Sequence, residues 1–160
     1  MGVPRWMALV SALALCAAPA VFAAGKRAFH ADLAAEWQTR YTESRATGRA
    51  EFELDLDTLT LSWTLSFQDL SGPPVSLALH APAQPGANGA RILELAAPGS
   101  RSPVRGSATI SAAQVQYLLY GWSYVNVTTA RFPRGEIRGQ LDVRPPQTAS
   151  PAVPTATRAP

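Results

Sequence analysis

The sequence is poor in the residues that build most metal and redox sites. Its only cysteine, Cys16, lies near the N-terminus, and its two histidines are His30 and His80. A chain cut after its N-terminal apolar segment would hold no cysteine, so we expect neither a disulfide nor thiol chemistry in the mature protein. Its stability must then come from a packed core, and no cofactor is expected.

Motifs of common enzyme classes are also missing. No serine sits in a nucleophile-elbow motif, and no glycine-rich loop is suited to cradle a phosphate. We therefore expect a protein that is not an enzyme. A hydrolase whose site cannot be seen in the sequence is an alternative, which a deep pocket lined by perturbed acids would favour. The acids of the central segment are expected mostly on exposed faces: Glu36, Glu43, Glu51, Glu53, Asp55 and Asp57.

Strong charge of one sign is absent as well. The formal net charge is only +3 at pH 7, and the arginines are scattered along the chain. A nucleic-acid-binding protein would more often cluster basic residues and interleave them with aromatics. We expect no nucleic-acid partner and arginines that lie mostly on solvated faces, although weak attraction to anionic surfaces stays open.

The N-terminus has the three-part layout of a secretory signal peptide. Arg5 supplies the positive charge, residues 7–16 form an apolar run, and small residues lead to Ala24. The run is too short for a comfortable membrane span of roughly 20 residues. We predict a signal peptide over residues 1–23 and a periplasmic or secreted protein with no membrane span after cleavage. A retained N-terminal anchor is the alternative, and Leu15 before Cys16 argues against lipidation.

The other end of the chain has a composition that does not favour folding. Residues 144–160 contain repeated proline, alanine and threonine and no large apolar residue other than Val153. Because proline cannot donate to a strand ladder, we predict a disordered tail here. The folded domain is therefore expected over residues 27–143.

Between these ends the hydrophobic pattern has a period of two. Apolar residues alternate with polar ones over residues 49–56 and again over 59–67, and Asp57-Thr58 separates the two runs. Strict alternation predicts half-buried strands, and the short break predicts a hairpin with Trp63 on its buried face. Shorter strands are predicted over residues 75–80, 91–95, 104–110, 123–128 and 136–143. In the first of these, the apolar residues Val75, Leu77 and Leu79 alternate with Ser76, Ala78 and His80.

One segment has a helical pattern instead. Ser111 can cap the N-terminus of a helix that ends just before Gly121, with Val115, Leu118 and Leu119 on one face. A short helix is predicted over about 111–120. Together with the strands it predicts an all-β fold, a Greek-key, immunoglobulin-like β-sandwich of about 7–9 strands.

The order of several motifs resembles a known family. These motifs are Ala-Thr-Gly at 46–48, Leu-His-Ala-Pro-Ala at 79–83, Gly-Ala-Asn-Gly at 86–89, the run from Gly121 to Ala130, and Gly-Glu-Ile-Arg-Gly-Gln-Leu at 135–141. Together they resemble the chordin-type (CHRD) domain, found in secreted bacterial proteins and, as repeats, in chordin. The resemblance runs from Phe29 to about Val143. It implies an extracellular or periplasmic protein, and bacterial members have no agreed biochemical activity.

The resemblance also implies where a metal site could lie and why this chain departs from it. The family pattern usually has a His-x-His pair before the Pro-Ala and another histidine after Tyr-Val-Asn-Val. Here Ala78 and Thr128 replace two of those three histidines and only His80 is left. His30 would have to reach across the domain. One imidazole beside a hydroxyl is a poor copper or zinc site, so we expect no tightly bound metal.

The motif residues also supply the candidates for binding. Asn126 is expected on a polar face, bonded to a neighbouring loop, and Glu136 and Arg138 are expected to share a strand face and pair. Arg131 and Arg134 could join Asn126, Glu136 and Arg138 in a recognition patch, with Arg134 in a type I turn that ends at Gly135.

These observations lead to two competing functions. We expect an exported CHRD-domain protein that is a non-catalytic binding or structural module of the periplasm or cell envelope. Its partner would be another protein or a cell-surface polymer. The alternative is a metal-binding or redox protein of superoxide-dismutase-like type with a degenerate histidine site.

Overall fold

A computed structural model describes residues 25–143 of the chain. The predicted signal peptide at 1–23 and the predicted tail at 144–160 lie outside the described residues, so both stay predictions. Within residues 25–143, no helix is both long enough and apolar enough to cross a membrane.

Strands make up about half of the described part. It contains nine strands, one α-helix and one short 3-10 helix. In chain order these elements are β1 (Lys26–Ala34), η1 (Ala35–Trp37), β2 (Thr47–Asp55), β3 (Thr60–Gln68), β4 (Pro74–Ala81), β5 (Ala90–Ala96), β6 (Val104–Thr109), α1 (Ala112–Leu119), β7 (Tyr124–Thr129), β8 (Ile137–Gln140) and β9 (Asp142–Val143).

The predicted hairpin is β2 and β3. The two strands pair antiparallel from Asp55↔Thr60 to Thr47↔Gln68. The turn between them is closed by Asp55, whose Oδ1 accepts hydrogen bonds from the backbone N–H groups of Asp57 and Thr58, both at 2.9 Å. An acidic side chain that satisfies two turn amides is a common way to fix such a turn.

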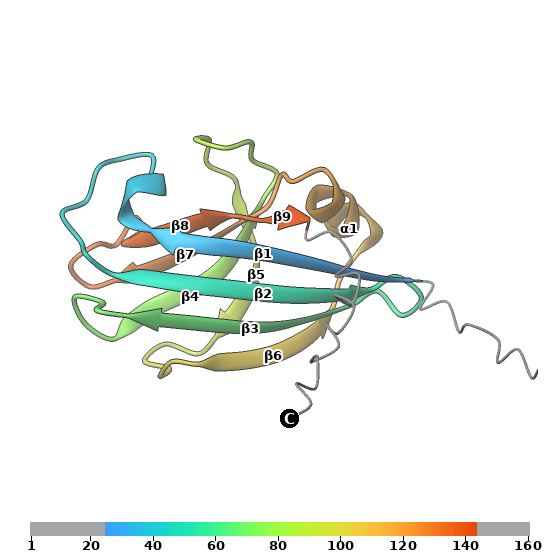
Figure 1. The fold of residues 1–160 in the computed structure, drawn as a ribbon, viewed down its shortest axis with the longest axis horizontal. Coiled ribbons are helices and arrows are strands. Elements are labelled where there is room, and N and C mark those ends of the chain that lie inside the picture. The colour runs from blue at the N-terminus through green and yellow to red at the C-terminus, as the bar shows by residue number, and fades with distance from the viewer. Residues whose placement is uncertain (1–24, 144–160) are drawn as a thin grey trace, which may run out of the picture.

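The strands form one hydrogen-bonded path that nearly closes on itself. Its order is β5-β4-β7-β8-β1-β2-β3-β6, and β9 also pairs with β1. β4 lies beside β7 and β3 lies beside β6, so the connections cross as in Greek-key folds. Figure 1 shows β1, β2, β3 and β6 in front and β4, β5 and β7 behind, and α1 covers one end. The predicted all-β fold with one helix is confirmed.

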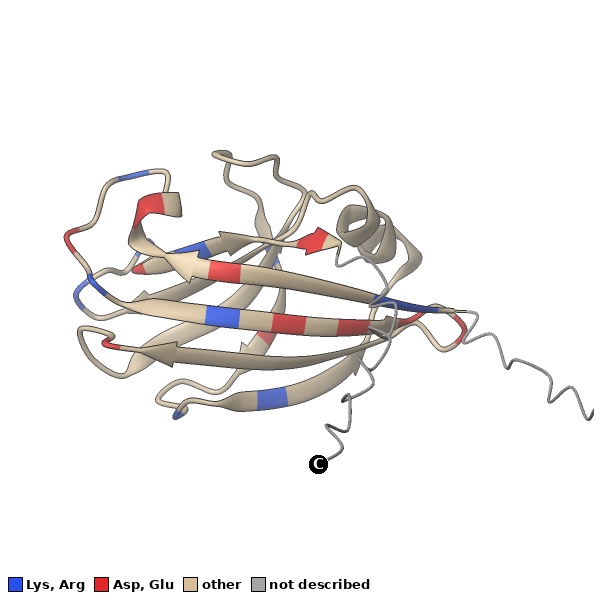
Figure 2. Ribbon diagram, viewed as in Figure 1, with Lys and Arg blue, Asp and Glu red and all other residues tan. Residues whose placement is uncertain are grey.

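The core fills the space between these two layers. Leu54, Leu61 and Leu65 of the hairpin have no exposed surface, and neither do Leu77 and Val125 of the rear layer. The outer face of the front layer instead carries charged residues spaced along the strands (Figure 2). This is the alternation that an antiparallel sheet with one solvated face requires.

Trp63 is a large member of the core, as predicted. Its side chain is 8% exposed, and its indole Nε1–H donates a 3.0 Å hydrogen bond to the carbonyl oxygen of Leu95. Gly106 lies opposite Trp63 on β6. A Cβ atom at Gly106 would stand 2.5 Å from Cζ2 of the indole, so only glycine leaves room for the ring.

The helix is confirmed with its predicted cap. Ser111 Oγ accepts from the backbone N–H of Gln114 at 3.3 Å, and Gln114 Oε1 accepts from the backbone N–H of Ser111 at 2.8 Å. This reciprocal pair is a capping box, and it satisfies two amides that the helix itself leaves unpaired. Val115 and Leu118 point into the core.

Three details differ from the sequence prediction. β1 was not predicted, although Phe29, Ala31 and Leu33 are buried on alternate positions. Val75 was expected on the buried face but is 52% exposed, because the register with β7 shifts between Pro74 and Ser76. The strand predicted over 136–143 is two strands, since the pairing is interrupted at Leu141.

Candidate functional site

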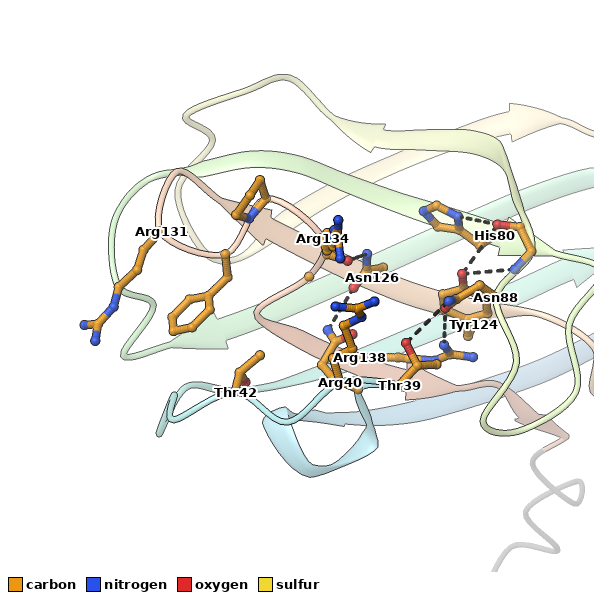
Figure 3. A pocket seen from close by; sticks show the side chains of 15 residues that line it. Thr39, Arg40, Thr42, His80, Asn88, Tyr124, Asn126, Arg131, Arg134 and Arg138 are labelled. Atoms are coloured by element: carbon orange, nitrogen blue, oxygen red, sulfur yellow. Dashed lines mark hydrogen bonds between the residues drawn. The ribbon is translucent and has the colours of Figure 1, made fainter.

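A pocket lies over the outer face of β4, β7 and β8. Its volume is about 710 Å³, within the range of roughly 300–1,000 Å³ that is common for small-molecule sites. The loop after η1 forms one wall and the β7–β8 connection forms another. Figure 3 shows the side chains that line it.

Three stacked side chains from neighbouring strands form the floor. Tyr124 of β7 lies opposite His80 of β4, and the two rings are nearly parallel with centroids 5.0 Å apart. The guanidinium carbon of Arg138, from β8, lies 3.5 Å from the centroid of the Tyr124 ring. Tyr124 itself is only 3% exposed. The floor is therefore a packed surface that contains a cation, and its tyrosine is not an open stacking platform.

Arg138 also holds the loop that borders the floor. Its Nη2 donates to the carbonyl oxygen of Ala87 at 2.6 Å, and its Nη1 donates to Oδ1 of Asn88 at 3.1 Å. The backbone N–H of Gly89 donates to the Tyr124 hydroxyl at 3.2 Å. These contacts leave Arg138 only 2% exposed, and it still lines the pocket. Burial lowers the pKa of Arg138, because it disfavours the charged form.

The opposite wall is fixed through Asn126. Its Oδ1 accepts from Gln38 Nε2 at 2.9 Å, and its Nδ2 donates to the carbonyl oxygen of Arg134 at 3.3 Å. The expected bond from Asn126 to a neighbouring loop is thus present. The turn around Arg134 also has the expected form: the N–H of Gly135 donates to the Phe132 carbonyl at 3.1 Å. Arg134 does not have the positive φ that a type II turn requires there.

Glu136 does not lie where the sequence placed it. It has no exposed surface and does not line the pocket. Its carboxylate accepts four hydrogen bonds: from Ser44 Oγ at 2.7 Å, from the backbone N–H and Oγ of Ser71 at 2.8 Å each, and from Thr129 Oγ1 at 2.6 Å. Burial raises the pKa of this carboxyl, but the hydrogen bonds together outweigh burial and hold it below its usual value.

The expected surface pair between Glu136 and Arg138 is therefore wrong. Both side chains are buried, and each bonds to different partners. Alternation put Arg138 on the correct face of the strand, opposite the core-facing Ile137, but could not show that the 82–89 loop covers that face. In the described part of the chain, the ion pairs are Lys26–Glu53, Arg49–Glu51 and Arg91–Glu94, and none involves an arginine of the pocket.

The pocket is consequently positive. Arg40, Arg131, Arg134 and Arg138 line it, and none of the residues that the structure places in its lining is aspartate or glutamate. Arg40, Arg131 and Arg134 are exposed at the rim. Arg131 packs over Phe132, with its guanidinium carbon 5.3 Å from the ring centroid, and extends away from the other labelled arginines in Figure 3.

His80 is the only titratable imidazole in this lining. Its Nδ1 donates to the carbonyl oxygen of Gly89 at 3.1 Å, since a carbonyl oxygen can only accept. Burial is the main cause that lowers the pKa of His80, with Arg138 and Arg91 adding to it against the opposing effect of the Gly89 bond. The neutral ring is thus favoured, and its one bonded partner is a backbone group.

The positions implied for a metal share one face of the sheet. Ala78 pairs with Asn126, His80 with Tyr124, and Thr128 with Ser76. Residues opposite one another on antiparallel strands project to the same side. Among residues 25–143, no three His, Cys, Asp or Glu side chains lie together as a candidate metal site.

Sequence reasoning identified part of this site. Four of the five candidate binding residues line the pocket, namely Asn126, Arg131, Arg134 and Arg138, and Glu136 does not. Gln38, Thr39, Arg40, Asn88 and Tyr124 were missed. Most of these residues lie in loops, where the hydrophobic pattern has no period. The sequence signals for them were the Gly86–Gly89 motif, which contains Asn88, and the Gly121–Ala130 motif, which contains Tyr124.

Comparison with known proteins gives one match. The family model of the CHRD domain matches residues 29–141. Neither the curated proteins nor the solved structures include a match to the chain. The matched range includes every strand from β2 to β8, most of β1 and the residues of the pocket floor and walls.

Proposed function

The chain belongs to the CHRD domain family, and we propose that it is an exported, non-catalytic binding module whose ligand sits in the arginine-lined pocket. The observation that carries this proposal is the pocket itself. Its polar walls are fixed by bonds from Gln38, Asn126 and Arg138 within the protein. Such a preorganised site loses little conformational entropy when a ligand binds.

The groups present in the pocket support binding rather than catalysis. A hydrolytic or acid–base site needs a positioned nucleophile or a pair of proton-transferring groups. The lining described here offers arginines, amides and hydroxyls, and its imidazole bonds to a backbone carbonyl. These groups can hold and orient a molecule.

The export part of the proposal depends on the N-terminal sequence. Arg5, the apolar run 7–16 and the small residues before Ala24 favour cleavage and release into the periplasm or the medium. A pocket that faces solvent outside the cytoplasm would meet cell-surface polymers, their fragments and small solutes.

A pocket-blocking variant tests the binding function. Thr39 is exposed and lines the pocket, so Thr39→Trp should fill part of its volume. Thr109→Trp is the matched control, because Thr109 is an exposed threonine on β6, away from the pocket. A chemically diverse compound library would be screened by thermal shift against both variants and the wild-type protein.

We expect compounds that stabilise the wild type and Thr109→Trp but not Thr39→Trp. Mass spectrometry should recover each of them unchanged after prolonged incubation. Conversion of a bound compound by the wild type, but not by Thr39→Trp, would show that the site is catalytic. Ligands that stabilise all three proteins equally would show that binding occurs elsewhere.

A further inference from the structure

The hydrogen-bonding groups of the pocket are unevenly used. Its prominent acceptors already have protein donors: Asn126 Oδ1 accepts from Gln38, Asn88 Oδ1 from Arg138, and the Gly89 carbonyl from His80. The donors are far less used, because Arg40 and Arg134 make no ion pair within the described residues. A ligand that suits this pocket must therefore bring acceptors.

Arg138 shows where one acceptor group would bind. Of the five N–H donors of a guanidinium, two bond to Ala87 and Asn88, which leaves three. Buried charges are usually paired with an opposite charge, yet Arg138 is 2% exposed and forms no ion pair in the described chain. Tyr124 stabilises one face of the cation, but a ring does not neutralise a full charge. An anion bound in the pocket would supply that partner.

The rim supplies a second cationic position. Arg40, from the loop after η1, and Arg134, from the β7–β8 turn, line the same pocket from different walls and are exposed. A ligand that reaches from the floor to the rim would meet Arg138 at one end and these two side chains at the other.

We propose that the ligand is a small polar molecule with at least two oxyanion groups, one bound by Arg138 on the floor and another by Arg40 and Arg134 at the rim. This inference rests on the proposed binding function and names its ligand class. Guanidinium groups bind carboxylate, phosphate and sulfate through paired hydrogen bonds. A pocket of about 710 Å³ holds a phosphorylated or carboxylated sugar of one or two units.

The same geometry argues against nucleobase recognition. Proteins that bind single strands stack bases on open aromatic faces. Tyr124 is covered by His80 and Arg138, and Phe132 lies under Arg131. The phosphates of an oligonucleotide could still meet the arginines, so an oligonucleotide belongs in the test.

The test measures affinity by calorimetry as the anion count rises. The probes are glucose, glucose 6-phosphate and glucose 1,6-bisphosphate, with digalacturonate as the carboxylate counterpart and a thymidine octanucleotide as the nucleic-acid arm. We expect no binding of glucose and at least about tenfold tighter binding of the bisphosphate than of the monophosphate, because a second charged group is engaged. If the bisphosphate binds more tightly than digalacturonate, the pocket prefers phosphate groups, and the reverse order indicates carboxylate groups.

Four variants locate the two anion positions. Arg40→Gln and Arg134→Gln should each weaken the two-anion probes about tenfold or more. Arg105→Gln, which removes an equal charge from the exposed face of β6, should change affinity less than about twofold. Arg138→Lys keeps the charge but loses the planar fork, and should weaken both phosphates. If Arg138→Lys does not fold, the affinities of Arg40→Gln and Arg134→Gln test the proposal without it.

The measured affinities separate a wrong ligand class from a pocket that is not a binding site. If Thr39→Trp abolishes binding of neutral or cationic compounds while the two-anion probes bind no better than glucose, the pocket is a binding site but the ligand class is wrong. Equal losses in Arg105→Gln and Arg134→Gln would also overturn the inference, because attraction would be non-specific. Tightest binding by the octanucleotide would replace a small ligand with a nucleic acid.

Discussion

Two buried charges of opposite sign lie two residues apart in the chain, and they are satisfied in different ways. Glu136 accepts four hydrogen bonds from Ser44, Ser71 and Thr129. Arg138 has two hydrogen bonds and one aromatic face. The carboxylate is complete within the protein and the guanidinium is not, which is why the arginine, and not the glutamate, marks the candidate site.

The predicted burial of Trp63 can be tested by truncating its side chain. Trp63→Ala should lower the free energy of unfolding by about 3–5 kcal/mol, because it removes a buried aromatic side chain and leaves a cavity. Trp37→Ala is the control: Trp37 is 57% exposed, and its loss should change stability by about 0.5 kcal/mol or less. Urea unfolding measures both, and equal midpoints for the two variants would show that Trp63 is not a core residue.

His80 should make stability depend on pH. Burial first, and then Arg138 and Arg91, lower its pKa below the ordinary value of 6.5 in the folded protein, while Gly89 and Glu94 oppose them. The unfolded chain then binds a proton more readily, so stability should fall as the pH drops below about 6.5, and the loss should level off below the folded-state pKa.

The His80→Asn variant isolates this effect. Unfolding free energies at several pH values between about 5 and 8 should fall more steeply with acid for the wild type than for the variant. Parallel curves would mean that His80 is equally easy to protonate in the folded and unfolded states.

At the scale of elements, regular strands could be predicted and irregular segments could not. The alternation of Phe52 and Leu54 with charged residues is strong, so the hairpin was predicted with its turn. β1 was missed because alanines occupy both of its faces: Ala28 is exposed and Ala31 is buried. This weakens the contrast on which sequence patterns depend.

The pocket was only partly predictable for the same reason. Arg131, Arg134 and Arg138 lie close in sequence on the β7–β8 hairpin, so they could be grouped in advance. Arg40 and Asn88 join them through loops whose paths depend on tertiary contacts, such as the bond from Asn88 to Arg138. Local sequence carries no signal for such contacts.

The register of β4 and β7 can be tested with metal ligands. Ala78 and Thr128 lie on the face that carries His80, so Ala78→His with Thr128→His should bind zinc or copper more tightly than the wild type does. Elemental analysis and metal titration measure the gain, and thermal melts check folding, because Ala78 is 1% exposed.

Removing His80 provides the control for that experiment. Adding His80→Gln to the double variant should cancel most of the gain in affinity, because one of the three ligands is lost. A folded double variant without added affinity would show that the three positions do not converge. Affinity that survives the loss of His80 would place the metal elsewhere.

At the scale of the whole molecule, one prediction concerns where the mature chain begins. The N-terminal layout predicts cleavage near Ala23/Ala24 and release of the folded domain. N-terminal sequencing of protein recovered from the native envelope and medium should start near Ala24. Recovery of a membrane-bound chain that still begins with Met1 would show a retained anchor.

The domain combines a packed apolar core with a solvent-facing pocket over β4, β7 and β8. The sheet path brings β4, β7 and β8 side by side, and this places His80, Tyr124 and Arg138 on one floor. The loop after η1, the 82–89 loop and the β7–β8 connection then build the walls. A rigid sheet that carries variable loops is a common arrangement for a binding module.

Chemical-shift mapping tests the claim that this pocket is the binding site most directly. The ¹⁵N-labelled protein would be titrated with glucose 1,6-bisphosphate, glucose and a dicationic diamine. We expect saturable shifts with the bisphosphate alone, centred on the amides of Gly89, Asn126, Gly135 and Arg138, with Gly106 on β6 unaffected. Shifts centred outside the pocket, or no saturable shift with any of the three compounds, would contradict the claim that this pocket is the binding site.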